Sequence, residues 1–156
     1  MRITGYKKEY LDRIMEINDA CYEGVYRAPR DVVEQMIGVS DTFTAQIAEG
    51  DFAGDYPNDL PEKSIIGFAI VRWDNVFPYI WNIAVDPAYQ GRSVGGNLLR
   101  QIIKRYTLAK QKQITLHVNA QNPAQKLYFD YGFRVKSIEK DYFKPDDGLI
   151  MTRLLP

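Results

Sequence analysis

The chain has 156 residues, of which 46% are hydrophobic and 26% charged, values typical of one globular domain with a single core. Lys and Arg together number 20, as do Asp and Glu, so the formal net charge is zero. This balance argues against a strongly basic nucleic-acid-binding protein, although it leaves room for a local basic patch.

The first part of the chain predicts a strand, two helices and a second strand. Residues 2–6 suit a short strand, and apolar side chains then recur at helical spacing over 11–21. Pro29 is expected in the first turn of a second helix, which Gly38 ends. Residues 42–48 alternate between apolar and polar like a half-buried strand.

The rest of the chain predicts a long loop followed by five strands and two helices. Residues 49–62 are acidic and rich in Gly and Pro, which is typical of a long hairpin loop. Strand, strand, helix, strand, helix, strand and strand are then expected at 65–73, 79–85, 94–106, 114–118, 123–131, 133–138 and 149–155. The strand–helix–strand unit implies a parallel pair, so we expect one α+β domain over residues 1–156 with a mixed sheet.

The single cysteine, Cys21, allows no internal disulfide, which is typical of a reducing compartment. Its place on the apolar side of the first helix favours a small buried hydrophobe over a nucleophile. The first residues lack the apolar core of a signal peptide, and no apolar run is long enough to span a bilayer. We therefore expect a cytoplasmic protein.

The segment DPAYQGRSVGGNLL, residues 86–99, places three glycines where a strand is followed by a helix. The start of a helix carries unpaired N–H groups and the positive end of the helix dipole, and glycine lets an anion approach the backbone closely. Arg92 and the hydroxyl of Ser93 would add a charge and a donor. The spacing fits neither the P-loop nor the dinucleotide motif, so an anion site and a merely tight turn remain as alternatives.

Two segments, NIAVDPAYQGRSVGGNLL and LHVNAQNPAQKLYFDYGF, together resemble the motifs of the GNAT acetyltransferase superfamily. The resemblance covers nearly the whole chain, and the order of elements is also that of the superfamily. It implies a mixed, mostly antiparallel seven-stranded sheet whose central parallel pair splays at the cofactor site, flanked by about four helices. It also implies acetyl-CoA as the cofactor.

The resemblance assigns the cofactor contacts to a strand end and to the glycine turn. Backbone groups of Ile83, Ala84 and Val85 would pair with the pantetheine arm, with the Val85 N–H as the oxyanion donor. The pyrophosphate would be held by the turn residues Gln90, Gly91, Arg92, Ser93, Val94, Gly95 and Gly96. Ser93 stands where the motif has a glycine, and it suits this role only if its φ stays negative. Tyr128 follows Asn122 by six residues instead of seven, so either Gln121 or Asn122 takes the place of the family's asparagine.

Within the superfamily the chain most resembles the Nα-acetyltransferases of the archaeal protein N-terminal and ribosomal-protein-alanine types. These enzymes also include the eukaryotic catalytic subunits. The strand LHV and the ten-residue spacing between Tyr79 and Tyr89 resemble the eukaryotic enzyme that acts on Met-initiated chains. The tail DYFKPDDGLIM resembles the family's tail, with Phe143 and Gly148 replacing a tyrosine and an alanine. The implied reaction is direct attack of a protein's α-amino group on acetyl-CoA, with base catalysis through an ordered water.

The resemblance also assigns the catalytic side chains. Tyr79 and His117 would hold the water, and Tyr128 would orient or protonate the departing thiolate. His117 is the only histidine and so the only side chain with an intrinsic pKa near 7. Each residue also has a structural alternative: Tyr79 as a packing aromatic, His117 as a strand histidine bonded to a neighbour, and Tyr128 as a core tyrosine.

Two loops are expected to flank the substrate amine. The residues are Tyr22, Glu23 and Tyr26 after the first helix, and Tyr142 and Phe143 in a loop between the last two strands. The expected partner is a protein or peptide N-terminus, which suits a protein working near the ribosome as a monomer or weak dimer. We expect no metal, membrane or specific nucleic acid. The alternatives are a small-amine acetyltransferase, for instance acting on a polyamine, and a non-catalytic acetyl-CoA-binding module.

Overall fold

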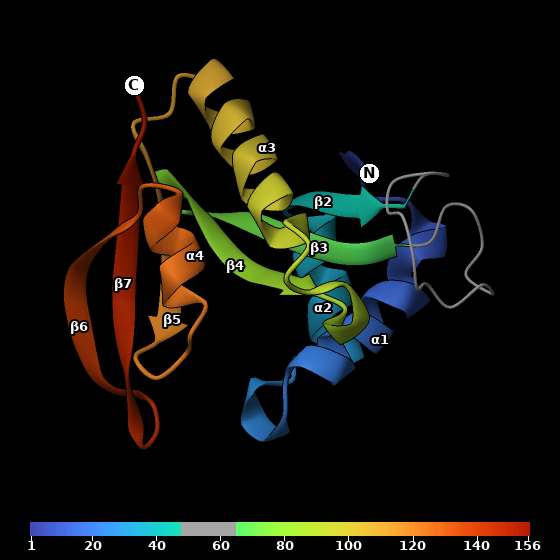
Figure 1. The fold of residues 1–156 in the computed structure, drawn as a ribbon, viewed down its shortest axis with the longest axis horizontal. Helices are drawn as coiled ribbons and strands as arrows, with labels where there is room; N and C mark the ends of the chain where they lie inside the picture. The colour runs from blue at the N-terminus through green and yellow to red at the C-terminus, as the bar shows by residue number, and fades with distance from the viewer. Residues whose placement is uncertain (48–64) are drawn as a thin grey trace. The chain divides into compact units, whose positions relative to one another are not determined.

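A computed structural model describes residues 1–47 and 65–156 (Figure 1). The strands in this part of the chain are β1 (Arg2–Gly5), β2 (Asp41–Gln46), β3 (Ile65–Asp74), β4 (Phe77–Val85), β5 (Gln113–Asn119), β6 (Arg134–Phe143) and β7 (Asp146–Leu154). The helices are α1 (Leu11–Cys21), α2 (Arg30–Gly38), α3 (Val94–Leu108) and α4 (Gln125–Asp130), with short 3-10 turns η1 (Lys8–Tyr10), η2 (Gly24–Tyr26) and η3 (Pro87–Tyr89). The acidic segment 49–62, which the sequence predicts to be a loop, lies outside the described residues.

The strands of the described residues form one seven-stranded sheet in the order β1-β2-β3-β4-β5-β7-β6. β4 and β5 run parallel, with Tyr79 opposite Thr115 and Ile80 opposite Leu116. The pairs β1–β2, β5–β7 and β6–β7 are antiparallel. Helix α3 connects the two parallel strands, as a crossover connection requires. The predicted mixed sheet and order of elements are therefore confirmed.

The chain divides into two compact units, and β3, β4 and α3 each pass from one to the other. The first unit comprises Met1–Ile70 and Asn82–Leu98, and the second comprises Val71–Trp81 and Leu99–Pro156. The first unit buries the apolar stripe of α1, including Ile14 and Ile17, which are fully inaccessible. No helix in the described ranges is long and apolar enough to cross a membrane.

A glycine in β3 brings the start of α3 close to the sheet within the first unit. A β-carbon built on Gly67 would lie 3.0 Å from the carbonyl oxygen of Ala84 and 3.2 Å from Cγ1 of Val94. Contacts this short would force the neighbouring atoms to move by a few tenths of an ångström. Gly67 therefore allows the first turn of α3 to lie directly on β3 beside the end of β4, which is where the glycine turn begins.

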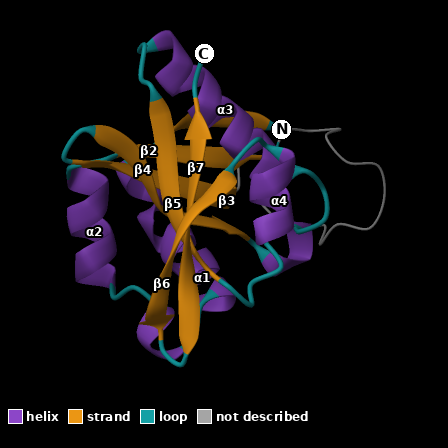
Figure 2. Ribbon diagram, turned by 90° about the vertical axis from the view of Figure 1, so that its left-hand side faces the viewer, coloured by secondary structure: helices purple, strands orange, loops and turns teal. Residues whose placement is uncertain are grey.

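The second unit contains the long hairpin of β6 and β7, drawn in orange in Figure 2. Its pairing runs from Arg134 opposite Thr152 to Phe143 opposite Asp146. The expectation that Tyr142 and Phe143 lie in a loop is therefore wrong, because both belong to β6. The turn between the strands has only two residues, so β6 continues to the tip of the hairpin, although its register with β7 shifts between Glu139 and Phe143.

Candidate active site

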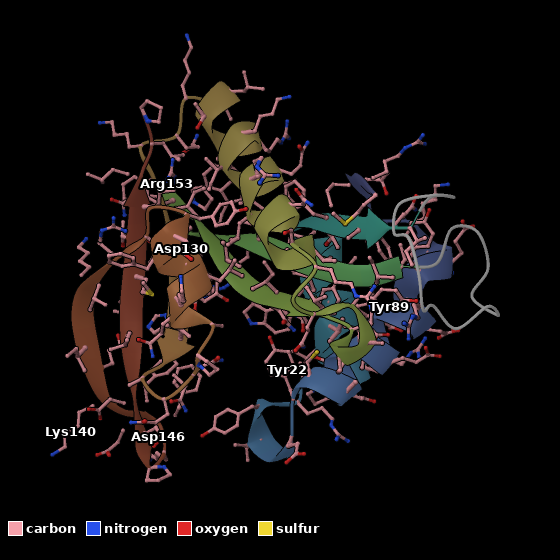
Figure 3. All side chains as sticks on the ribbon, in the orientation of Figure 1. Tyr22, Tyr89, Asp130, Lys140, Asp146 and Arg153 are labelled. Carbon is pink, nitrogen blue, oxygen red and sulfur yellow. The ribbon has the colours of Figure 1, made fainter. Side chains whose placement is uncertain are left out.

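In the first unit, β4 leads into α3 through a turn that Asp86 anchors. The Asp86 carboxylate accepts a hydrogen bond of 2.8 Å from the N–H of Ala88 and forms an ion pair with Arg13. The backbone N–H of Asp86 donates to the carbonyl of Ile66 at 2.9 Å. Tyr89, labelled in Figure 3, is buried at the end of η3 with 1% of its surface exposed. These contacts fix the entry to residues 90–93.

The turn itself has two residues in the left-handed conformation, Gly91 at φ +72° and Ser93 at φ +63°. Ser93 therefore does not keep the expected negative φ. It adopts the left-handed conformation that a glycine at this motif position adopts without strain, so its backbone can follow the same course as that of the motif's glycine. A non-glycine residue pays about 1–2 kcal/mol for this conformation. Ser93 is the last residue before α3, so this strained conformation lies directly at the start of the helix.

The start of α3 offers donors that suit a diphosphate. In any α-helix the first N–H groups have no acceptor within the helix, and in α3 these belong to the residues from Val94 onward. The first bond of the helix is donated by Asn97 to the carbonyl of Ser93, at 2.9 Å. A β-carbon at Gly91 would meet no atom within 4 Å, so the backbone of the turn is open to a ligand. Arg92 is exposed beside it. These features fit the phosphates of acetyl-CoA.

The carbonyl groups at the end of β4 already have partners within the first unit. The Tyr22 hydroxyl donates to the carbonyl of Ile83 at 2.9 Å, and the Gln90 amide donates to that of Val85 at 3.0 Å. Cys21 also donates to the Val85 carbonyl, at 3.2 Å, and burial raises the pKa of its thiol. Two residues predicted to bind ligand, Tyr22 and Gln90, thus contact the strand expected to hold the pantetheine arm. Cys21 is a half-buried neutral thiol, where full burial was expected.

The other residues predicted to contact the peptide from this part of the chain are exposed. Glu23 precedes the short turn η2, and Tyr26 ends it with 43% of its surface exposed.

In the second unit, the structure brings Tyr79 and His117 together. The two side chains come from the neighbouring parallel strands β4 and β5, and the Tyr79 hydroxyl lies 2.8 Å from Nδ1 of His117. The ring of Tyr142 stacks on the imidazole with centroids 4.4 Å apart and planes 14° apart. Phe143 meets Tyr142 edge-on at 4.8 Å. One cluster therefore contains two predicted catalytic residues and two predicted substrate residues.

Two charged residues that the sequence analysis did not single out complete this cluster. Oε2 of Glu139 on β6 lies 3.3 Å from Nε2 of His117, and the guanidinium of Arg72 on β3 lies 4.7 Å from the centre of the Tyr79 ring. Neither belongs to a motif, and charged residues in strands are usually solvated. Only the register of the sheet, which is not visible in the sequence, identifies them.

Burial controls the protonation of Tyr79, of which only 6% is exposed. Burial raises the pKa of the Tyr79 hydroxyl strongly, the neighbouring Tyr142 raises it further, and Arg72 acts in the opposite direction. The phenol therefore stays protonated at neutral pH and is available to donate to Nδ1 of His117.

Tyr128 lies on α4, 8% exposed, and burial raises the pKa of its hydroxyl to about 12. The turn before α4 contains the two candidates for the family's asparagine, and both are exposed. Oδ1 of Asn122 accepts a bond of 2.9 Å from the N–H of Ala124, whereas Gln121 donates its N–H to Oδ1 of Asn119 at 2.7 Å. Asn122 thus uses its side chain to shape the start of α4.

A family model described as an acetyltransferase (GNAT) domain matches residues 57–135. A ribosomal protein bS18-alanine N-acetyltransferase of Haemophilus ducreyi is 34% identical over 88 residues, which cover 56% of this chain and 61% of that protein. The chain spans about half to six-tenths of the length of the curated relatives it matches.

Two solved structures share the fold. The ribosomal-protein-S18-alanine N-acetyltransferase from Escherichia coli superposes with a TM-score of 0.80 at 22% identity, covering 99% of this chain and 93% of that one. Arabidopsis thaliana NAA60 in complex with a bisubstrate analogue superposes with a TM-score of 0.82 at 16% identity, covering 99% and 97%.

Proposed function

Because the chain belongs to the GNAT acetyltransferase family, we propose that it transfers the acetyl group of acetyl-CoA to the α-amino group of protein N-termini. The observation that carries this proposal is the 2.8 Å contact between the Tyr79 hydroxyl and Nδ1 of His117 on adjacent parallel strands. The named activity of the bS18-alanine relatives supports the choice of acceptor. A peptide that begins with alanine is accordingly the first substrate to test.

The first unit binds the activated acetyl donor in this proposal. Acetyl-CoA supplies a thioester whose acyl carbon is open to attack by an amine. The amides at the start of α3 bind its diphosphate, and the left-handed residues Gly91 and Ser93 aim the backbone of the turn at the phosphates. Arg92 adds a positive charge at the exposed edge of the turn.

The second unit accepts the proton that the amine must lose. A protein α-amino group has a pKa of about 8, so part of it is neutral at pH 7 and a weak base is sufficient. An ordered water takes the proton from the attacking nitrogen while giving one to the oxygen of Tyr79. Tyr79 in the same step passes its own proton to Nδ1 of His117. The amine nitrogen forms its bond to the acyl carbon, and the carbon–sulfur bond breaks.

Tyr128 assists the leaving group in this proposal. Because burial raises the pKa of its hydroxyl to about 12, the phenol is protonated at neutral pH and has a hydrogen to offer. It orients the departing thiolate by a hydrogen bond. Coenzyme A thiolate is a competent leaving group, so orientation contributes more here than proton transfer.

A transfer assay with defined acceptors tests the proposal. Purified protein is incubated with isotope-labelled acetyl-CoA and peptides that begin with Ala, Ser-Glu or Met-Leu, or with spermidine. A matched control peptide contains lysine but carries a blocked N-terminus, and mass spectrometry locates the label. We expect label on free α-amino groups and none on the blocked peptide. Label on spermidine alone overturns the proposed acceptor, and tight binding of acetyl-CoA with no transfer overturns catalysis.

A further inference from the structure

Glu139 reaches the catalytic histidine from a strand that does not border it. His117 lies on β5 and Glu139 on β6, and β7 runs between these strands. Glu139 is paired with Gly148 of β7, which has no side chain to stand between the two. His117 is opposite Ile150 on β7, two residues along from Gly148, so the Glu139 carboxylate reaches diagonally across β7 and ends 3.3 Å from Nε2 of His117.

A β-bulge in β6 lets both Glu139 and Tyr142 contact the imidazole ring of His117. Glu139 and Tyr142 are three positions apart, so a regular strand would direct their side chains to opposite faces of the sheet. The register between β6 and β7 shifts between Glu139 and Phe143, and such irregularities redirect side chains. As a result, Glu139 binds the edge of the imidazole of His117 while Tyr142 covers its face.

The hydrogen bonds around His117 are consistent with one neutral tautomer. An ionised carboxylate can only accept, so Nε2 carries the hydrogen that it shares with Glu139. Nδ1 is then unprotonated and accepts from the Tyr79 hydroxyl, which burial keeps protonated. The alternative tautomer would turn the lone pair of Nε2 toward a negative carboxylate.

We propose that Glu139 is a positioning residue that fixes the tautomer of His117, so that Nδ1 is free to take the proton of Tyr79. This inference rests on the proposed acetyl transfer. When Tyr79 gives its proton to Nδ1 and receives another from the water, the imidazole becomes a cation with a hydrogen on both nitrogens. Glu139 then pairs with a positive ring, and the ring returns the Nδ1 proton to solvent after the product leaves. The side chain of Glu139 is 44% exposed, which screens this pairing and limits its effect.

Nitrogen NMR on the untagged 156-residue chain tests the tautomer directly. His117 is the only histidine of the chain, so every imidazole nitrogen signal of such a sample belongs to it. At a pH where the ring is neutral, we expect the wild-type shifts to show a hydrogen on Nε2 and none on Nδ1. A wild-type ring with its hydrogen on Nδ1 overturns the proposal.

Two variants separate the acceptor from the charge. Glu139→Ala removes both the acceptor oxygen and the negative charge. We expect the nitrogen shifts of His117 in this variant to move toward a mixture of tautomers, and its kcat to fall about 10-fold. This fall is well short of the loss seen when a buried orienting carboxylate is removed. Glu139→Gln keeps an acceptor oxygen, so we expect wild-type shifts and a smaller fall in kcat. KM for acetyl-CoA stays unchanged in both, because Glu139 acts on the ring and not on the donor.

Lys140→Ala is the matched control, since Lys140 is the exposed neighbour of Glu139 on β6 and extends away from the strand (Figure 3). We expect wild-type shifts and kcat from it. Unchanged shifts and unchanged kcat in Glu139→Ala overturn the positioning role. If the wild-type protein transfers no acetyl group at all, the proposed function fails, and the nitrogen shifts of wild type and Glu139→Ala still decide whether Glu139 fixes the ring.

Discussion

Gly148 on β7 lies directly against Tyr142 on β6: a β-carbon built at position 148 would be 2.8 Å from the β-carbon of Tyr142 and 2.9 Å from its Cγ. Glycine usually weakens a strand because it has no side chain to pack. Here its small size lets the Tyr142 ring lie close to the sheet and stack on His117. The environment of the predicted catalytic histidine therefore depends on the absence of a side chain on the strand between β5 and β6.

Replacing Gly148 by alanine is expected to displace Tyr142. The added methyl meets a β-carbon, which cannot rotate away, so the hairpin must shift at a cost of about 1–3 kcal/mol in the free energy of unfolding. We also expect kcat to fall, because the shifted ring no longer covers His117. Urea unfolding and steady-state kinetics measure the two effects.

Gly38→Ala is the control for this substitution. A β-carbon at Gly38 meets nothing within 4 Å, and this residue ends α2 without a positive φ. We expect its free energy of unfolding to stay equal or to rise by up to about 1 kcal/mol. A Gly148→Ala protein that unfolds at the wild-type urea midpoint would contradict the role given to this glycine.

Removal of the proton relay is expected to affect turnover and not donor binding. Tyr79→Phe deletes the hydroxyl that lies 2.8 Å from His117, and His117→Ala deletes the acceptor. We expect kcat to fall about 100-fold in each, the lower end of the usual effect of a general base, with the Kd for acetyl-CoA within about twofold of wild type. Equilibrium dialysis and initial rates give both quantities. Wild-type rates at every pH in both variants would show that the relay is assigned wrongly.

The buried hydroxyl of Tyr128 predicts a loss of stability in alkali. Its folded pKa is about 12, and an unfolded tyrosine titrates near 10, so the unfolded chain releases this proton first. The corresponding stability is fully present below pH 10 and is lost as the pH rises toward 12. The loss at pH 11 is about 1.4 kcal/mol.

Urea unfolding at pH 8 and pH 11 measures this loss. The wild-type protein is expected to lose about 1.4 kcal/mol more than Tyr128→Phe between the two pH values. Tyr79, whose pKa is also raised by burial, is present in both proteins and cancels in the difference. Equal losses in the two proteins would mean that Tyr128 ionises as readily in the folded state as in the unfolded one.

The left-handed conformation of Ser93 predicts a small effect for one substitution and a large one for another. Glycine adopts φ +63° without strain but loses more entropy on folding, so Ser93→Gly should change the free energy of unfolding by less than about 1 kcal/mol and preserve the affinity for acetyl-CoA. A β-branched side chain is poorly tolerated in this conformation, so Ser93→Val should lower both the free energy of unfolding and the affinity for acetyl-CoA. Calorimetric titration with acetyl-CoA checks the affinities. Weaker binding by Ser93→Gly than by Ser93→Val would exclude the backbone of this turn as the phosphate site.

The sequence by itself determined the parts of this protein whose physics is local. The order of strands and helices follows from hydrophobic periodicity, and the glycine turn before α3 follows from contiguous residues, since the N–H groups at a helix start are unpaired wherever it lies. The family was also recognisable at this level, because its two motifs are short, contiguous runs, and the match over residues 57–135 confirms it.

Only the tertiary structure decided which distant side chains meet. Glu139 and His117 are 22 residues apart in sequence, and their contact depends on the register of two antiparallel pairings and on a β-bulge. The position of Tyr142 on a strand, and not in a loop, likewise depends on the pairing of β6 with β7. A shift of one residue in register turns every side chain of a strand to the other face, so no local pattern specifies such contacts. For this reason the sequence identified the tyrosine and the histidine of the cluster, and the folded sheet alone supplied the glutamate.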